Sequence, residues 1–374
     1  MRILVALDKF KGSLSAVEAV DAVCEGLRAG LPDAELIRLP LADGGEGTAE
    51  VFARALGGEM VEAPCHDALG RAIVSSYGWV PAESTAILEM SGPSGMWRLR
   101  KEELNPLETS TRGTGELLLD AERRGAKRIL VGLGGSATND GGLGLAAAIG
   151  FRFLDDGDAE VDPIPRNFLR IARILPPEHL PQAEIVAISD VRNPLLGEHG
   201  ATAVFGPQKG AGPEQLEALE RGLAHFADVI RRDLGCDHRE APGAGAAGGL
   251  GFGLLSFLGA RIEPGFDAFA KLTHLDDHLA QCDLVITGEG LLDSQTLHGK
   301  GPGGLAGRAR THGRPVLAIA GALRHEDRLA DLYDACFSIA PGPITVEESM
   351  RDARALLART ATQVAKVIAR TKAL

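Results

Sequence analysis

The chain contains six short, almost continuous apolar runs, each ending at glycine or a polar side chain. They are RILVALD (2–8), ELIRLPLAD (35–43), RILVGLGG (128–135), EIVAISD (184–190), DLVITGEG (283–290) and PVLAIAG (315–321). Strands that are apolar along their whole length suit a parallel sheet buried on both faces. Helical patterns such as AVEAVDAVCEGLRAGL (16–31) alternate with them, so the sequence predicts βα units and an α/β fold.

Chain length and one atypical region predict two domains. The chain has 374 residues, and a domain usually holds about 100–200. Between residues 66 and 95, RAIVSSYGWV and STAILEMS read as strands joined by PAE without a helix, which indicates an antiparallel pair. We predict a Rossmann/flavodoxin-like parallel sheet from residues 1–65 plus 280–374, with a second α/β domain, residues 66–279, inserted.

Composition narrows the classes of partner. The formal net charge is −12 and no Lys/Arg-rich run occurs, whereas nucleic-acid binding needs a cationic surface. No apolar stretch approaches the roughly 18–20 residues of a membrane span, and MRILVALDKF reads as a strand rather than a signal peptide. The five cysteines form no CxxC pair, as in reduced proteins. We therefore expect a cytoplasmic protein that binds neither nucleic acid nor membrane.

Polar side chains stand at the ends of five of these runs. In open parallel sheets, ligands bind outside the carboxyl ends of the strands. One acid after a strand often only caps a helix, but five polar ends predict a shared ligand site. These residues are Asp8, Asp43, Ser136, Asp190 and Glu289.

The stretch ILVGLGGSATNDGGLGLAAAIG (129–150) holds six glycines between Gly132 and Gly144. Without a Cβ, backbone N–H groups can approach an anion closely, and a helix start favours negative charge. Asp140 would cap the helix or face a metal. The alternative is a tight turn without a ligand. The residues expected to hold phosphate are Gly134, Gly135, Ser136, Thr138 and Asn139.

GLGGSA (132–137) also matches the dinucleotide-binding pattern G-x-G-x-x-A after a strand. Asp155 follows near the spacing of the acid that binds a ribose hydroxyl. Against this, the glycines of NDGG fall where the helix should continue, at about 1 kcal/mol each relative to alanine. An NAD(P)-dependent oxidoreductase acting on a small hydroxy acid therefore stays an alternative.

Two further loops carry lysines beside possible ligand groups. DKFKGSLS (8–15) places Lys9, Lys11 and Ser13 just past the first strand, where an anion is favoured by the next helix. A capping serine with surface lysines is the alternative. ITGEGLLDSQTLHGKGP (286–302) contains Lys300, and lysines neutralise phosphoryl oxygens in phosphoryl transfer, although a solvated loop lysine explains it equally well.

Taken together, the motifs resemble the type-1 glycerate kinase family of bacteria, from residue 2 to about 370. The resemblance rests on their order: DKFKGSLSA, LADGGEGT, GLGGSATNDGG, SDVRNPLLG, GATAVFGPQKGA, GAGAAGGLG and DLVITGEGLLDSQTLHGKGPGG. It implies a two-domain kinase that phosphorylates D-glycerate with ATP and Mg²⁺ in organic acid catabolism. The implied product is 2-phosphoglycerate, with 3-phosphoglycerate as the alternative, and a homodimer is left open.

The resemblance and the chemistry of the side chains together suggest roles. We expect Asp190 to accept or orient the glycerate hydroxyl, and Lys300 to act on the transferring phosphate. Glu289 and Asp293 are expected to bind Mg²⁺. The expected substrate-binding residues are Lys9, Lys11, Ser13, Asp43 and Asn193, where Asn193 would also fix its loop. Those expected to bind the nucleotide are Gly134, Gly135, Ser136, Thr138, Asn139 and Gly288.

Overall fold

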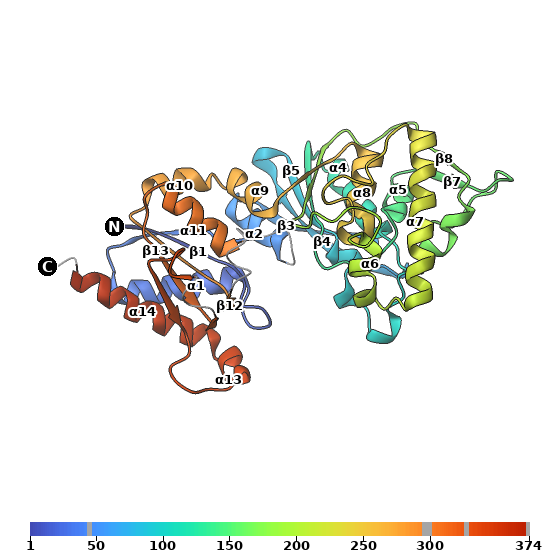
Figure 1. The fold of residues 1–374 in the computed structure, drawn as a ribbon. Coiled ribbons are helices and arrows are strands. Elements are labelled where there is room, and N and C mark those ends of the chain that lie inside the picture. Colours follow the sequence, from blue (N-terminus) through green and yellow to red (C-terminus); the bar gives the residue numbers. More distant parts are fainter. Residues whose placement is uncertain (43–46, 294–300, 325–328, 372–374) are drawn as a thin grey trace. The chain divides into compact units, whose positions relative to one another are not determined.

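The computed structural model describes residues 1–42, 47–293, 301–324 and 329–371, and it has an α/β fold (Figure 1). The chain divides into two compact units. Unit 1 comprises Met1–Asp43 and Phe266–Leu374, and unit 2 comprises Gly44–Gly265. The limits differ from those expected from the sequence: residues 47–65 belong to unit 2, and residues 266–279 belong to unit 1. That the units are independent domains stays a prediction.

Unit 1 is built on a five-stranded parallel sheet. Its strands lie in the spatial order β2 (Glu35–Arg38), β1 (Arg2–Leu7), β11 (Leu284–Gly288), β13 (Val316–Ala320) and β15 (Ala335–Ser338). When the five strands are numbered in chain order, their spatial order is 2-1-3-4-5, as in flavodoxin-like sheets. In such a sheet the direction of strand addition reverses between the first and the third strand, which here are β1 and β11. The predicted Rossmann/flavodoxin-like class is confirmed.

Helices cover this sheet, and two of them pack with almost no space between their backbones. Ser15 and Glu18 form a reciprocal capping box at the start of α1, which satisfies otherwise unpaired N–H groups. A Cβ on Gly26 of α1 would lie 2.1 Å from the carbonyl oxygen of Ala358 in α14. The helices are α1 (Ala16–Gly30), α9 (Gly265–Leu272), α10 (Leu275–Gln281), α11 (Gly301–Thr311), α13 (Val346–Arg351) and α14 (Ala353–Thr371), and β12 (Leu291–Leu292) pairs with β14 (Ala322–Leu323).

Unit 2 contains a six-stranded mixed sheet whose spatial order follows the chain. The strands are β3 (Glu59–His66), β4 (Ala72–Val80), β5 (Thr85–Glu89), β6 (Arg128–Gly132), β9 (Glu184–Ile188) and β10 (Arg261–Glu263). The β4–β5 pair is antiparallel, as the missing helix between the two apolar segments indicates. From β5 to β10, neighbouring strands run parallel.

Helices and a small hairpin complete unit 2. Its core includes a cluster of phenylalanine rings, with the centroids of Phe151 and Phe257 4.8 Å apart and those of Phe168 and Phe226 5.2 Å apart. The remaining elements are α2 (Thr48–Ala55), α3 (Ser91–Ser94), α4 (Arg112–Arg123), α5 (Leu143–Ala148), β7 (Arg152–Leu154), β8 (Arg173–Leu175), α6 (Ala201–Phe205), α7 (Pro213–Leu234) and α8 (Ala246–Leu258).

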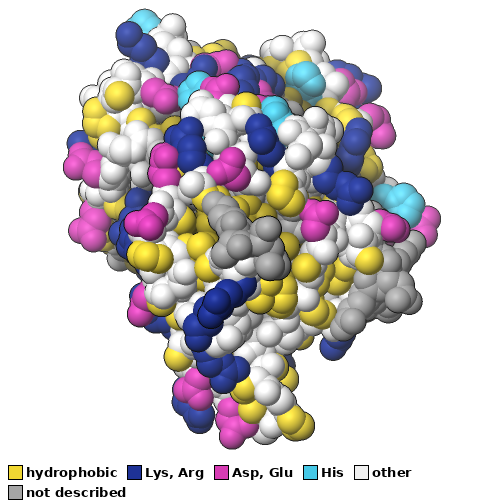
Figure 2. Space-filling view, turned by 90° about the vertical axis from the view of Figure 1, so that its left-hand side faces the viewer, with side chains coloured by type: hydrophobic (Ala, Val, Ile, Leu, Met, Phe, Trp, Pro, Cys, Tyr) yellow, Lys and Arg dark blue, Asp and Glu magenta, His cyan; other side chains and the backbone are white. Residues whose placement is uncertain are grey.

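Acidic and basic side chains are interspersed over the face shown in Figure 2, and hydrophobic side chains gather in its middle.

Within the described residues, no helix combines the length and the hydropathy that crossing a membrane requires.

The contact at Gly26 gives a test of the packing in unit 1. We expect Gly26→Ala to lower the stability of the chain by about 1–3 kcal/mol, because the added methyl group overlaps the backbone of α14. Gly307 of α11, where a Cβ would meet nothing within 4 Å, is the matched control. Gly307→Ala should stabilise its helix by about 0.5–1 kcal/mol. Urea unfolding midpoints measure both, and equal shifts would contradict the packing argument.

Candidate active site

Two acidic side chains follow the strands at which the strand order of unit 1 reverses. Asp8 comes directly after β1, and Glu289 directly after β11. Ligands of open parallel sheets bind at such a reversal. Both residues line one pocket of about 810 Å³, formed within unit 1. The structure thus brings two of the predicted polar strand ends into a single cavity.

The loop after β1 contributes lysines to the same pocket, which Lys9, Lys11 and Ser13 line. The loop is closed by reciprocal backbone hydrogen bonds between Phe10 and Leu14, each of 2.9 Å, and Phe10 is buried. These bonds fix the backbone that carries both lysines at the carboxyl end of the sheet.

Ser13 holds this loop against the end of α13. Its Oγ donates a hydrogen bond of 2.5 Å to the carbonyl oxygen of Met350. Ser15, rather than Ser13, caps α1. The Ser13 side chain therefore connects two segments that line the pocket. Its expected contact with the substrate stays a prediction.

Glycines allow the ends of β11 and β13 to approach each other. A Cβ on Gly288 would lie 1.8 Å from the carbonyl oxygen of Ile319, and one on Gly321 would lie 2.5 Å from that of Gly290. Gly321 N donates to the carbonyl oxygen of Glu289 at 3.2 Å. Strand packing thus accounts for the glycine at position 288, and phosphate binding by Gly288 stays a prediction.

A tyrosine for which the sequence predicted no role, Tyr333, lies close enough to Glu289 to be affected by its charge. Tyr333 is buried, and among the described residues its hydroxyl has no hydrogen-bond partner. Burial, with the negative charge of Glu289 as a second cause, raises the pKa of Tyr333 well above its usual range. The hydroxyl therefore keeps its proton and is available as a donor. No local sequence signal distinguishes this tyrosine.

Three other residues of unit 1, Asp43, Asp293 and Lys300, have roles expected from the sequence. Asp293 follows β12 and is not among the residues that line the pocket. Asp43 and Lys300 lie outside the described residues, so their expected roles stay predictions.

In unit 2, the parallel strands β5, β6 and β9 are neighbours, so the residues at their carboxyl ends share one edge of the sheet. Asp190 lies at this edge, and its Oδ1 accepts a hydrogen bond from Gly265 N at 2.9 Å. Asn193 Nδ2 donates to the carbonyl oxygen of His199 at 2.8 Å, which fixes the loop. Ser136 lies at the same edge, after β6, and is buried.

The glycine-rich stretch packs against a second glycine-rich segment at the start of α8. Gly141 N donates to the carbonyl oxygen of Gly248 at 3.0 Å. A Cβ on Gly248 would lie 2.0 Å from the carbonyl oxygen of Thr138, and one on Gly142 would lie 2.9 Å from Gly253 Cα. Backbone-to-backbone packing therefore explains several of these glycines without a ligand.

The polar side chains of this stretch are turned into unit 2. Thr138 and Asn139 are fully buried, and within the described residues Thr138 Oγ1 and Asn139 Oδ1 lack hydrogen-bond partners. Asn139 Nδ2 donates to Thr202 Oγ1 at 3.0 Å, and Lys209 Nζ donates to the carbonyl oxygen of Thr138 at 2.6 Å. A ligand in solvent does not reach these two side chains in this conformation. Their expected role in phosphate binding stays a prediction.

Two buried ionisable groups lie in this region, and burial shifts their pKa values in opposite directions. Asp140 accepts hydrogen bonds from Thr111 N and Oγ1, both at 2.7 Å, and from Gly142 N and Gly144 N, both at 3.1 Å. Its helix-capping role is thus observed. Burial raises the pKa of Asp140, while these hydrogen bonds favour its charged form. Burial lowers the pKa of Lys209 to about 7, against the opposing effect of Asp140.

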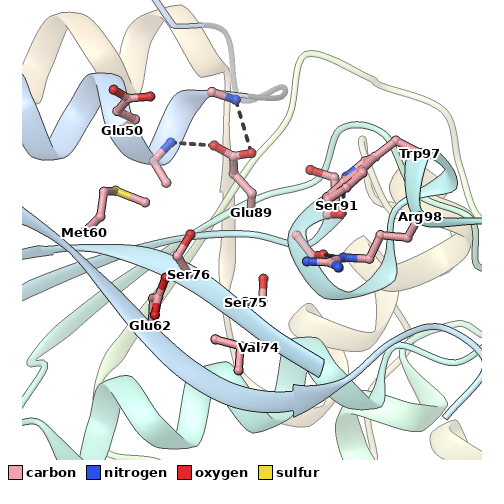
Figure 3. Close-up of a pocket in the computed structure, with 13 residues that line it drawn as sticks. Glu50, Met60, Glu62, Val74, Ser75, Ser76, Glu89, Ser91, Trp97 and Arg98 are labelled. Atoms are coloured by element: carbon pink, nitrogen blue, oxygen red, sulfur yellow. Dashed lines mark hydrogen bonds between the residues drawn. The ribbon is translucent and has the colours of Figure 1, made fainter. Parts of the chain in front are cut away.

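A smaller pocket of about 300 Å³ lies within unit 2 (Figure 3). Glu89 lies at its centre and accepts hydrogen bonds from Gly47 N at 3.2 Å and Ala49 N at 2.7 Å. Glu89 thereby caps α2, whose N-cap residue is a glycine without a side chain. Glu50, Glu62 and Arg98 also line this pocket, so its charged residues are mostly acidic and make it a poor site for a polyanion.

On the opposite wall of this pocket, an arginine stacks on an exposed tryptophan (Figure 3). The Arg98 guanidinium carbon lies 4.4 Å from the centroid of the Trp97 ring, and Trp97 Nε1 donates to the carbonyl oxygen of Ser91 at 2.8 Å. No sequence pattern predicts a role for either residue, because a Trp-Arg pair in a short 3-10 turn (Met96–Arg98) carries no distinctive signal.

Comparisons with known proteins decide the family. Residues 3–369 match the model of the glycerate kinase family. The chain belongs to this family. It is 41% identical to a glycerate kinase of Bacillus subtilis (strain 168) over 98% of each chain. It is 39% identical to a glycerate 2-kinase of Escherichia coli (strain K12), which covers 99% of this chain and 98% of the relative. A crystal structure of a putative glycerate kinase 2 from Salmonella typhimurium LT2 matches with a TM-score of 0.91 and 40% identity, covering 100% of both chains.

As a glycerate kinase family member, the chain is a phosphotransferase, and the structure does not favour the oxidoreductase alternative. In a dinucleotide site the glycine turn opens directly into a helix. Here α5 begins only at Leu143, well after Gly132–Ala137. Asp155 accepts hydrogen bonds from Gly157 N and Ala159 N within a turn of the β7–β8 hairpin.

The buried lysine gives a pH-dependent test. The pKa of Lys209 is about 7 in the folded chain and near its ordinary 10.5 in the unfolded chain. Between these pH values the unfolded chain binds more protons, so the free energy of unfolding rises with pH across this window, by up to about 1.4 kcal/mol per pH unit. Stability is correspondingly lost as the pH falls toward 7.

We expect Lys209→Met to remove this contribution. Urea unfolding of the wild-type and variant chains between pH 7.5 and 9.5 measures it, with the wild type gaining stability relative to the variant as the pH rises. Parallel curves would show that Lys209 does not titrate in this window.

Proposed function

We propose that the chain transfers the γ-phosphoryl group of ATP to D-glycerate with the aid of Mg²⁺ and forms 2-phosphoglycerate. The observation that carries this proposal is the pocket at the strand-order reversal of unit 1, where Asp8, Lys9, Lys11 and Glu289 lie together. A polyphosphate with its divalent cation needs this combination of ammonium and carboxylate groups. The similarity to glycerate kinases along the whole chain supports D-glycerate as the phosphoryl acceptor. The E. coli relative named glycerate 2-kinase supports 2-phosphoglycerate as the product.

The side chains of this pocket fit Mg²⁺ bound together with phosphate. Mg²⁺ usually takes one or two carboxylates and completes its octahedron with water and substrate oxygens. Among the described residues no cluster of three or more metal-ligating side chains occurs, in keeping with such a shared site. We propose Asp8 and Glu289 as the protein ligands, with Asp293 as a further candidate. When bound, Mg²⁺ would neutralise charge on the phosphate oxygens.

The lysines of the β1–α1 loop supply positive charge to the same pocket. Lys9 and Lys11 are carried on a backbone fixed by the Phe10–Leu14 hydrogen bonds. Because both lysines line the pocket that contains Glu289, we propose that they contact phosphate oxygens rather than the substrate, which is the contact expected from the sequence. Phosphoryl transfer depends mainly on positioning and charge stabilisation of this kind.

In unit 2 we propose that the Asp190 carboxylate orients the acceptor hydroxyl of glycerate and accepts its proton. The hydrogen bond from Gly265 N to Asp190 Oδ1 fixes the orientation of the carboxylate. Attack of the glycerate hydroxyl oxygen on the γ-phosphorus forms the new P–O bond and breaks the bond to ADP. The hydroxyl proton passes to Asp190. Asn193 stays a candidate for contacts with glycerate, and Ser136 stays a candidate for contacts with the nucleotide.

The role of Asp190 is tested by Asp190→Asn, assayed as ADP release with D-glycerate and MgATP. We expect kcat to fall by about 10²–10⁴-fold, because the amide accepts no proton. Asp156→Asn, at an exposed position beyond β7, is the matched control and should leave kcat unchanged. A folded Asp190→Asn enzyme with wild-type kcat would remove Asp190 from this role, and NMR of the product identifies the hydroxyl that reacts.

The metal site is tested by Glu289→Gln. We expect the Mg²⁺ concentration for half-maximal activity to rise about tenfold or more, because one of two charged ligands becomes neutral. Binding of Mn²⁺ in the presence of ATP, followed by electron paramagnetic resonance, should weaken in parallel. Glu178→Gln, on an exposed loop, is the control. Unchanged metal dependence in both assays would exclude Glu289 as a ligand.

A further inference from the structure

Four large apolar side chains of unit 1 are exposed around one cavity. Val346 is 74% exposed, and Met350, Leu291 and Ile344 are 38%, 37% and 37% exposed. All four line the 810 Å³ pocket that also contains Glu289. We call these four residues the apolar wall. They come from β12, from α13 and from the loop that precedes α13, so segments distant in the sequence supply one surface.

Local hydrogen bonds, rather than burial, hold the apolar wall in place. Thr345 and Glu348 form a reciprocal capping box at the start of α13, with Glu348 N donating to Thr345 Oγ1 at 3.1 Å. The end of α13 is held by Ser13, which donates to the carbonyl oxygen of Met350. Apolar surface left in water is unfavourable by about 25 cal/mol per Å². Single exposed apolar residues are common, but several around one cavity mark a ligand site.

The lining of the pocket combines two kinds of chemistry. Besides the apolar wall, it includes Asp8, Lys9, Lys11 and Glu289. A ligand that fits this lining combines an apolar group with a polyanionic group. Glycerate, with three carbons and one carboxylate, has no apolar group to place on the wall, whereas a purine nucleotide has both parts.

We propose that the apolar wall binds the purine base of ATP and that the triphosphate extends toward Lys9 and Glu289. This inference rests on the proposed function, which makes a nucleotide the phosphoryl donor. It assigns the base to unit 1 rather than to the glycine-rich stretch of unit 2, whose Thr138 and Asn139 side chains are fully buried. The smaller pocket of unit 2 is lined by three glutamates and one arginine, Arg98, so its excess of negative charge is less favourable for a triphosphate.

The experiment compares the wild-type chain with the double variant Val346→Thr/Met350→Gln. Both replacements keep nearly the shape of the original side chain and make the wall polar. Binding is followed by the fluorescence of N-methylanthraniloyl-ATP and by displacement with ATP or inorganic tripolyphosphate, in the absence of glycerate. The matched control is Val367→Thr, in α14 at a similarly exposed valine (64%) that does not line the pocket.

We expect the double variant to bind ATP about tenfold more weakly and to show a correspondingly raised KM for ATP, as expected from losing about one apolar side chain's contact with the base. Its affinity for tripolyphosphate, which has no base, should not change, and neither should its KM for D-glycerate. The control should behave as wild type. Val346→Thr alone should give a smaller change in the same direction and serves if the double variant is unstable.

The outcomes separate this inference from the proposed function. Unchanged ATP affinity in a wall variant that still phosphorylates glycerate overturns the inference and leaves the function standing. Equal weakening of ATP and tripolyphosphate also overturns it, because the wall would then act on the phosphates. A wild-type chain that binds ATP through the wall but releases no ADP with glycerate supports the inference and overturns the function.

Discussion

The parallel pairing of β1 with β11 is the constraint on which the candidate site of unit 1 depends. The two strands are aligned so that Leu7 lies opposite Gly288, and Asp8 N donates to the carbonyl oxygen of Gly288 at 2.9 Å. Within the same pair, Thr287 Oγ1 donates to the carbonyl oxygen of Ala6 at 2.7 Å. This register brings the residues after both strands into one pocket. The complete sequence of unit 2 lies between these strands, so the site is assembled only by tertiary structure.

Glycine has two physical uses in this chain, and a sequence pattern does not distinguish them. A missing Cβ lets a backbone approach either a ligand or another backbone. At Gly288 and Gly248 the approaching group is a carbonyl oxygen of the same unit. The sequence therefore predicts correctly where bare backbone is needed, but the nature of the neighbour depends on the packing of distant segments.

Features that depend on local sequence patterns could be predicted, whereas features that depend on the packing of distant segments could not. Apolar runs and their glycine or polar ends predicted the parallel strands and the antiparallel β4–β5 pair, because both patterns are local. The strand order that reverses at β1 and β11 depends on long-range pairing and has no local signal. Lysine is rarely buried, so nothing in the sequence indicated that Lys209 lies inside unit 2. Val346 is the opposite case, an apolar residue whose exposure only the structure reveals.

The two units position their polar groups by different means. Unit 1 has a strand-order reversal, and the loop that carries Lys9 and Lys11 lines a pocket there. Among the described strands of unit 2 the spatial order follows the chain, so no reversal opens a crevice there. Its polar groups are instead held individually, Asp190 by Gly265 N and Asn193 by its bond to His199. Groups whose geometry is fixed before a ligand arrives lose little freedom on binding. This difference is the physical basis for proposing the small hydroxy acid at the polar groups of unit 2 and the nucleotide, with its flexible phosphate chain, in the larger charged pocket of unit 1.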